Sequence, residues 1–381
     1  MKHQTITPYK PFFLIGWCFA IWGVSVWALH FYGLKAAWPG GIHAEAMTAG
    51  FLLCHVLGFL MTAFPNVTGS APASRGEWLV PAAAMVSAFA ILPSENIQSI
   101  RLLAGVAIFS LVAFVVRRIK SRSHPITSRP FPPILGFALV GILAGVTGLI
   151  FVLAGDQLGH AALTRAGRIL YLRIMMIAIV LGVGSLVIPY FSGHSDALIP
   201  PEKDLRATRN NSVILISLFA VGVLMECAAF DVAGRIVQAV PVIAVGFWQW
   251  RLHKAPPRRT PAARMLRLSS WLFALGIVGS AFLPEHALHL THLTYVGGLV
   301  MMVISVATRV ILAHGSQDVL QGEGSKIFYW LSFLIGVAAV TRASIGFTPD
   351  LYMSHLAYSA LLVALALLIW GFVFFKKMWE T

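Results

Sequence analysis

Three histidines stand at a spacing of three in an otherwise apolar stretch of the chain: His286, His289 and His292. On a helix such residues step by about 60° each, so the three rings would share one stripe of its surface. Neutral imidazole is a common ligand of haem iron and of other metals, whereas an imidazole facing lipid is costly. The stripe therefore predicts a metal or haem site inside a helical bundle. The competing interpretation is that these rings hydrogen-bond to neighbouring helices or to interfacial water.

A second group of candidates opens an apolar run near the N-terminus: His43, Glu45 and Met47. His43 and Glu45 are two residues apart and do not share a helix face, whereas Met47 follows His43 by about one turn. The Met47 thioether is either a soft metal ligand or a packing side chain. The predicted haem ligands are His43, His289, His292 and His355. The predicted ligands of a second metal are His43, Glu45, His286, His289 and His292.

Two arginines, Arg168 and Arg173, lie at the start of the apolar run 166–191. Because a guanidinium pairs well with a carboxylate, we expect these side chains to bind the propionates of a haem. The alternative is that they extend to the membrane interface and stay hydrated. The same alternative applies to Arg101, Arg309 and Arg342, which lie inside or beside other apolar runs.

Composition places these residues in a membrane protein. The 381 residues are 58% hydrophobic and only 11% charged, with a mean hydropathy of +0.81. The formal charge of +14 comes from basic residues in the loops between apolar runs, where membrane topology and anionic lipid explain them, so nucleic-acid binding is not expected. No separate water-soluble domain is visible, and residues 1–381 are predicted to form a single integral membrane domain. The sequence contains no CxxCH motif, so no covalently attached haem is expected.

Apolar runs of about 20 residues, the length that a bilayer requires, predict an all-α, polytopic bundle of twelve transmembrane helices. Their predicted ranges are 11–33, 42–65, 78–93, 98–117, 132–154, 166–191, 211–230, 232–251, 267–283, 286–311, 325–346 and 351–375.

Lysine and arginine predict the orientation of this bundle. With twelve spans, the most basic loops, near 117–129, 203–209 and 251–267, fall on the same side as both termini. The positive-inside rule then places both termini in the cytoplasm. In this orientation His43, His286, His289, His292 and His355 all belong to the outer third of the membrane.

The second, sixth and tenth predicted helices share features at a spacing of roughly 120 residues. Each begins near a histidine or an arginine on the predicted outer side, and each is rich in glycine and methionine. This rhythm is consistent with three arcs of four helices, as in haem-copper oxidase subunits, with the polar residues converging near the centre. That comparison is an analogy of architecture only.

Three separate stretches carry a family resemblance. Residues 42–69 (IHAEAMTAGFLLCHVLGFLMTAFPNVTG), 182–191 (GVGSLVIPYF) and 292–315 (HLTYVGG to TRVILAHG) are similar, in this order, to signature motifs of the NnrS family. The resemblance implies a haem- and copper-containing membrane protein of nitric oxide metabolism, linked to denitrification and to protection against nitrosative stress. Glu45 stands where the family has a second histidine, Ala46 where it has a glutamate, and Leu186 where it has an arginine. These departures put copper in doubt and leave non-haem iron, with Glu45 as a ligand, as the other option.

The resulting prediction is a b-type haem protein that binds or reduces nitric oxide. If it is an enzyme, its electrons would come from quinol or a redox protein, and Glu45 would carry protons as the catalytic carboxylate. The alternatives are a multi-pass transporter and a haem or copper carrier without redox turnover. Few acidic residues other than Glu226 and Asp231 lie inside the predicted spans, which argues against a transporter.

Overall fold

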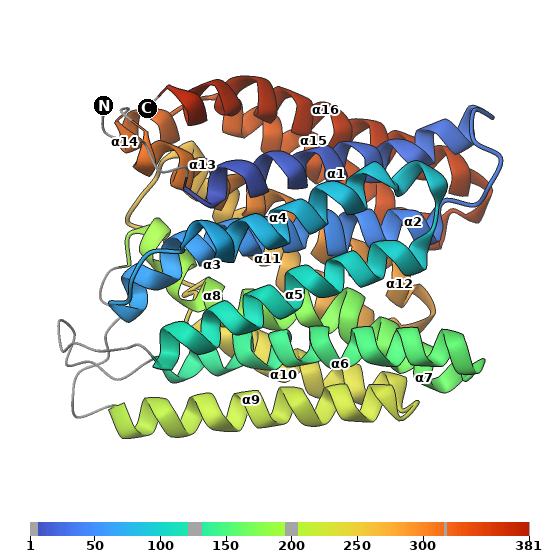
Figure 1. Ribbon diagram of the computed structural model, residues 1–381, viewed down its shortest axis with the longest axis horizontal. Coiled ribbons are helices and arrows are strands. Elements are labelled where there is room, and N and C mark those ends of the chain that lie inside the picture. The colour runs from blue at the N-terminus through green and yellow to red at the C-terminus, as the bar shows by residue number, and fades with distance from the viewer. Residues whose placement is uncertain (1–6, 121–131, 195–204, 316–317, 381) are drawn as a thin grey trace.

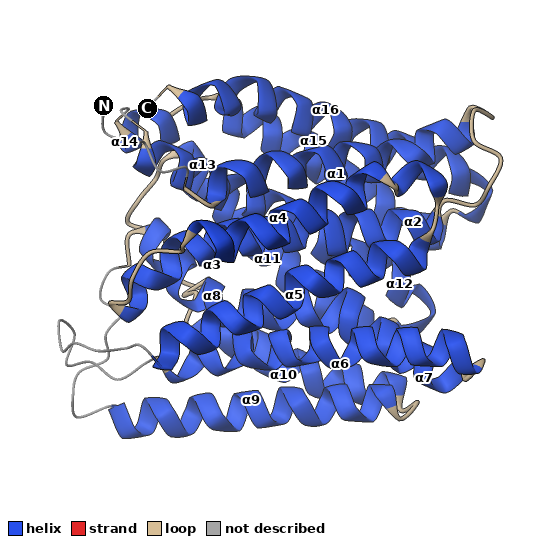
Figure 2. Cartoon of the chain, viewed as in Figure 1, coloured by secondary structure: helices blue, strands red, loops and turns tan. Residues whose placement is uncertain are grey.

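The chain folds into a bundle of long helices (Figures 1 and 2). The computed structural model describes residues 7–120, 132–194, 205–315 and 318–380, and every regular element within these ranges is a helix. The prediction of an all-α membrane bundle is therefore confirmed. Much of the basic loop sequence on which the predicted orientation depends, 121–131 and 195–204, lies outside the described residues.

Twelve long helical segments follow one another in the described ranges, three of them with a π-helical part. In chain order they are α1 (Tyr9–Phe31); α2 (Gly40–Ala44), η1 (Glu45–Leu52) and α3 (Leu53–Thr68); α4 (Arg75–Ala90); α5 (Ile97–Lys120); α6 (Gly136–Leu158); α7 (Ala161–Arg168), η5 (Ile169–Ile174) and α8 (Met175–Ser192); α9 (Leu205–Cys227); α10 (Asp231–Trp248); α11 (Pro261–Phe282); α12 (Ala287–His292), η9 (Leu293–Val300) and α13 (Met301–His314); α15 (Ile327–Ser344); and α16 (Tyr352–Trp379). The short helix α14 (Val319–Glu323) joins α13 to α15.

Eleven segments in the described part of the chain are long and apolar enough to cross a membrane, so the protein is a multi-pass membrane protein. The predicted count of twelve spans is not confirmed, because α4 has only 16 residues. At about 1.5 Å per residue such a helix is about 24 Å long, shorter than the roughly 30 Å hydrocarbon core.

Local capping explains where two helices begin earlier than their apolar runs. Helix α4 starts at Arg75 because Ser74 and Glu77 form a capping box, with the Ser74 N–H donating to Glu77 Oε2 at 2.8 Å. Helix α11 starts at Pro261 because the Thr260 hydroxyl oxygen accepts from the Ala263 N–H at 3.3 Å. Hydropathy alone does not predict these first residues of the two helices, because the residues that cap them are polar.

The three π-helical segments η1, η5 and η9 fall in the second, sixth and tenth helices, the ones that share features in the sequence. Segment η1 packs against α1 and meets η5, while η9 packs against α11 and α15. A π-helical turn widens the helix and is often found at a functional site. The described bundle therefore has a local irregularity at the same place in each of the three repeats that the sequence rhythm suggests.

The two terminal helices bring the ends of the chain to one end of the bundle. The Lys10 ammonium lies 5.3 Å from the centroid of the Trp379 ring. The opposite end, where α2, α7 and α12 lie in Figure 1, is called the distal end below. All predicted ligands are near the distal end, which matches their predicted common depth.

Glycines allow α6 to pack so closely against the segment α7–η5–α8 that the two backbones are in contact. A Cβ at Gly148 would lie 2.5 Å from the Tyr171 nitrogen, and one at Gly155 would lie 2.5 Å from the Thr164 nitrogen. From the other side, a Cβ at Gly167 would lie 2.4 Å from the Val152 nitrogen. Small residues that admit such close packing are typical of helix pairs in membranes.

The substitution Gly148→Ala is expected to lower the unfolding temperature of the purified protein, because its methyl group would collide with backbone rather than with a movable side chain. Overpacking of this kind costs about 1–3 kcal/mol. The matched control is Gly76→Ala in α4, where nothing lies within 4 Å of the added Cβ. Thermal unfolding of both variants in the same detergent checks the prediction, and equal stabilities would contradict it.

Candidate functional site

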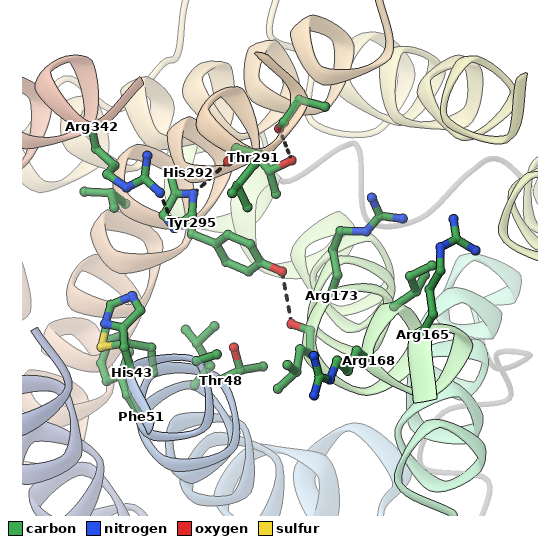
Figure 3. A pocket seen from close by; sticks show the side chains of 18 of the residues that line it. His43, Thr48, Phe51, Arg165, Arg168, Arg173, Thr291, His292, Tyr295 and Arg342 are labelled. Atoms are coloured by element: carbon green, nitrogen blue, oxygen red, sulfur yellow. Dashed lines mark hydrogen bonds between the residues drawn. The ribbon is translucent and has the colours of Figure 1, made fainter. Parts of the chain in front are cut away.

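A cavity of about 890 Å³ opens in the distal half of the bundle and is lined by all three π-helical segments (Figure 3). Its volume lies within the range of roughly 300–1,000 Å³ that is typical of ligand and cofactor sites. His43 and Phe51 lie across the cavity from Arg165, Arg168 and Arg173. The cavity therefore has a largely apolar wall with imidazoles and a strongly basic wall.

Two of the predicted haem ligands line this cavity, His43 and His292. His43 Nδ1 lies 2.6 Å from the carbonyl oxygen of Gly23, and His292 Nδ1 lies 2.8 Å from that of Leu288. A carbonyl oxygen can only accept, so Nδ1 carries the proton in each ring and Nε2 is the basic nitrogen. Both rings thus have the tautomer, and the backbone support, that metal-ligating histidines commonly show.

The other three predicted histidines lie outside the cavity lining, around the distal ends of α12, α15 and α16. His289 Nδ1 accepts from Arg342 Nη1 at 2.8 Å. The His286 ring lies 4.2 Å from the Phe347 ring, between centroids. His355 Nδ1 is 3.4 Å from the hydroxyl oxygens of Ser344 and Thr348. The structure therefore brings His43 and His292 to one cavity and places His286, His289 and His355 beside it.

The basic wall is built around one buried carboxylate, Glu226 of α9, which is 1% exposed. It forms ion pairs with Arg173 and with Arg235, the latter at 3.0 Å, and accepts a hydrogen bond from Gln238 Nε2 at 2.8 Å. Arg165 pairs with Asp231 at the start of α10. These contacts tie η5, α9 and α10 together and hold three guanidinium groups at the cavity.

Arg168 lines the same wall but has no hydrogen-bond or ion-pair partner among the described residues. Its guanidinium is exposed within the opening. Of the two arginines predicted to bind propionates, Arg173 is therefore already paired with Glu226, and Arg168 is available to a ligand.

Glu45 faces away from the cavity, where it is 1% exposed. Its Oε1 accepts from Arg101 Nε at 2.6 Å, and Arg101 Nη1 donates to Asp156 Oδ2 at the same distance. Asp156 reaches the cavity rim, where its other oxygen accepts from the Thr164 hydroxyl at 3.1 Å. The structure does not bring Glu45 to His286, its predicted partner at a second metal.

Charge is unbalanced around the cavity. Five arginines and three carboxylates line it: Arg165, Arg168, Arg173, Arg235 and Arg342 against Asp156, Glu226 and Asp231. The pair of Arg101 and Glu45 behind the wall adds no net charge. The lining therefore carries two positive charges in excess, inside a membrane protein where uncompensated charge is costly.

Within the described residues, no group of three or more His, Cys, Asp or Glu side chains could hold a metal ion. A site of that kind, made by protein ligands alone, is therefore not formed in the described part of the chain. A haem needs fewer protein donors, because its ring nitrogens supply most of the coordination of the iron.

Several cavity residues were not assigned to the site from the sequence: Arg165, Arg235, Arg342, Tyr295 and Glu226. Glu226 was visible as an acidic residue in an apolar run, and such a residue is a functional candidate by default. Its arginine partners lie 53 residues away at Arg173 and nine away at Arg235. Tyr295 links two π segments, because its hydroxyl donates to the Leu172 carbonyl oxygen at 3.0 Å (Figure 3).

Fold and site together define a class: a multi-pass helical membrane protein with a buried, basic cavity that presents two imidazoles. Comparison with protein families gives the particular one. The family model described as NnrS protein matches residues 5–381, nearly the whole chain, and the chain belongs to this family. No curated protein matches it. Membership of the NnrS family suggests a role in nitric oxide metabolism, and the family is known for its association with haem and copper.

Proposed function

We propose that this protein binds haem b in the distal cavity and there binds or reduces nitric oxide. The observation that carries the proposal is the pairing of two oriented imidazoles, His43 and His292, with a lining that has two positive charges in excess. Haem b is an apolar ring with two carboxylate groups, so its carboxylates offset part of that excess. Both the volume of the cavity and the apolar side chains on one wall suit the ring.

In this proposal His43 and His292 would hold the iron through Nε2, and Arg168, with Arg173 beside it, would bind the propionates. The haem would supply an iron through which electrons pass and at which nitric oxide binds once one of the two imidazoles gives way. The Gly23 carbonyl oxygen keeps the proton on His43 Nδ1 and makes Nε2 a stronger ligand for a metal. The Leu288 carbonyl does the same for His292.

The apolar wall has a role of its own. Val24, Trp27, Phe51, Leu356 and Val363 line the cavity, and the Trp27 ring lies 5.6 Å from the His43 ring, between centroids. Side chains of this kind exclude water and charged solutes but admit a small neutral gas. Nitric oxide partitions into lipid, so it needs no polar channel to reach such a wall.

The described residues fit copper less well. Of the predicted ligands of a second metal, His292 is assigned to the haem iron, His289 Nδ1 already accepts from Arg342, and Glu45 is already paired with Arg101. No step of the proposed function therefore depends on copper or non-haem iron.

The proposed setting is the bacterial inner membrane, with both termini in the cytoplasm and the cavity toward the periplasm. The basic loop residues of the sequence support this orientation. If nitric oxide is reduced, quinol or a partner redox protein is the proposed electron donor.

The full-length protein, purified from bacterial membranes, is expected to show a Soret band and the pyridine spectrum of haem b. Adding nitric oxide should shift the Soret band. An electrode measurement with a quinol as reductant then separates turnover from binding, because only an enzyme consumes nitric oxide continuously. A colourless protein that takes up no added haem would overturn the proposal and favour a transporter.

A further inference from the structure

Arg342 of α15 is a buried cation without an anion. Its side chain is 7% exposed and lines the distal cavity. Its hydrogen-bond partners among the described residues are neutral imidazole nitrogens, His289 Nδ1 at 2.8 Å and His292 Nε2 at 3.4 Å, and no described carboxylate forms an ion pair with it.

The guanidinium keeps donors for a further partner. Arginine has five N–H groups in a planar fork and no acceptor, and these two contacts use only two of them. No described hydroxyl oxygen accepts a hydrogen bond from Arg342. Of the other cavity residues, Thr291 donates to the Ala287 carbonyl oxygen and Ser359 to that of Ala338.

The position of Arg342 separates it from the rest of the basic wall. In Figure 3 it lies beside His292, across the cavity from Arg165, Arg168 and Arg173. Every other cavity arginine except Arg168 has a carboxylate partner. An anion bound at Arg168 therefore leaves the charge on Arg342 without a direct partner.

We propose that Arg342 is the centre of a second binding site in the cavity, for a small, planar, monovalent oxyanion. One uncompensated guanidinium calls for one negative charge. Two oxygens at the spacing of a carboxylate match two N–H groups of the fork, which makes the contact bidentate. Nitrite and formate have this shape and charge, whereas chloride is spherical. The site does not depend on the function proposed above, because Arg342 keeps its contact with His289 and its free N–H groups when His292 Nε2 is given to the iron.

The test measures formate binding to the purified full-length protein by calorimetry, with nitrite as the second probe and chloride as the shape control. Saturable binding is expected for formate and nitrite, and weaker binding for chloride. Arg342→Gln should weaken formate binding at least tenfold, because charged hydrogen bonds are lost. Arg342→Lys keeps the positive charge but loses the planar fork of N–H groups. Its affinity for formate should lie between those of the wild type and Arg342→Gln. Arg264→Gln in α11, an exposed arginine outside the cavity lining, is the matched control and should stay within about threefold of the wild type.

The Soret band, where present, is followed in the same titration. Binding that depends on Arg342 and leaves the Soret band in place supports the proposal. Binding that shifts the band and vanishes in His43→Ala is ligation of iron and contradicts it. Absence of saturable binding, or equal affinities in the wild type and Arg342→Gln, overturns it as well. If Arg342→Gln does not fold, the formate-to-chloride preference of the wild type and of Arg342→Lys decides.

Discussion

Replacing both His43 and His292 by alanine is expected to abolish the Soret band of the purified protein. These are the two imidazoles that line the distal cavity with the proton held on Nδ1. Each single variant removes one ligand, so its Soret band should shift and its retention of haem should fall on the order of 100-fold or more, since even loss of a ligand's supporting contact costs 10–100-fold.

The matched control is His355→Ala. His355 is also near the distal end, but its ring contacts Ser344 and Thr348 and does not line the cavity. The double variant, the two single variants and His355→Ala are purified side by side, and their absorption spectra and haem contents check the prediction. Free imidazole in the buffer should restore part of the band in the single variants. If His355→Ala loses the haem while the double variant keeps it, the proposed ligands are wrong.

Much of the fold follows from hydropathy. A membrane span must be apolar over most of its length, and its backbone N–H and C=O groups must form their hydrogen bonds within the span. The second, sixth and tenth helices were singled out from their glycine, methionine and polar starts. Their π-helical segments were not predicted, since no residue type marks a π turn as proline marks a kink.

The site was predicted only in part, and the histidine stripe shows why. The assumed step of about 60° requires one continuous helix from His286 to His292. Instead, Pro284 starts a 3-10 turn, Pro284–His286, and α12 begins after it at Ala287. His286 therefore does not continue the helix face on which His289 and His292 lie. Of the three histidines, only His292 lines the cavity.

The basic wall could not be read from the sequence because its pairs are formed between distant segments. Arg165 meets Asp231 across 66 residues, and Arg342 meets His289 across 53. A single sequence shows that these arginines lie in apolar surroundings, where reaching the interface is the ordinary explanation. It does not show which of them share a carboxylate, and that sharing sets the excess charge of the cavity.

Replacing Glu226 by alanine is expected to destabilise the protein more than any other substitution of a cavity carboxylate. Glu226 is buried and is the cavity carboxylate shared by two arginines, Arg173 and Arg235. Removing one partner of a buried ion pair costs about 3–5 kcal/mol, because the remaining charge is left uncompensated. The matched control is Glu285→Ala, since that side chain is exposed at the distal end and has no ion-pair partner among the described residues.

Thermal unfolding and the yield of monodisperse protein measure the effect, and a second substitution tests its cause. If the damage comes from uncompensated charge, Arg235→Gln in the Glu226→Gln background should recover part of the lost stability. Arg235→Gln alone should be close to neutral, because Arg173 still neutralises Glu226. A double variant no more stable than Glu226→Gln would show that Glu226 acts through its shape and hydrogen bonds instead. Recovery would mean that Glu226 stabilises the protein chiefly through its charge, because removing one of the two arginines that share this carboxylate then relieves the loss.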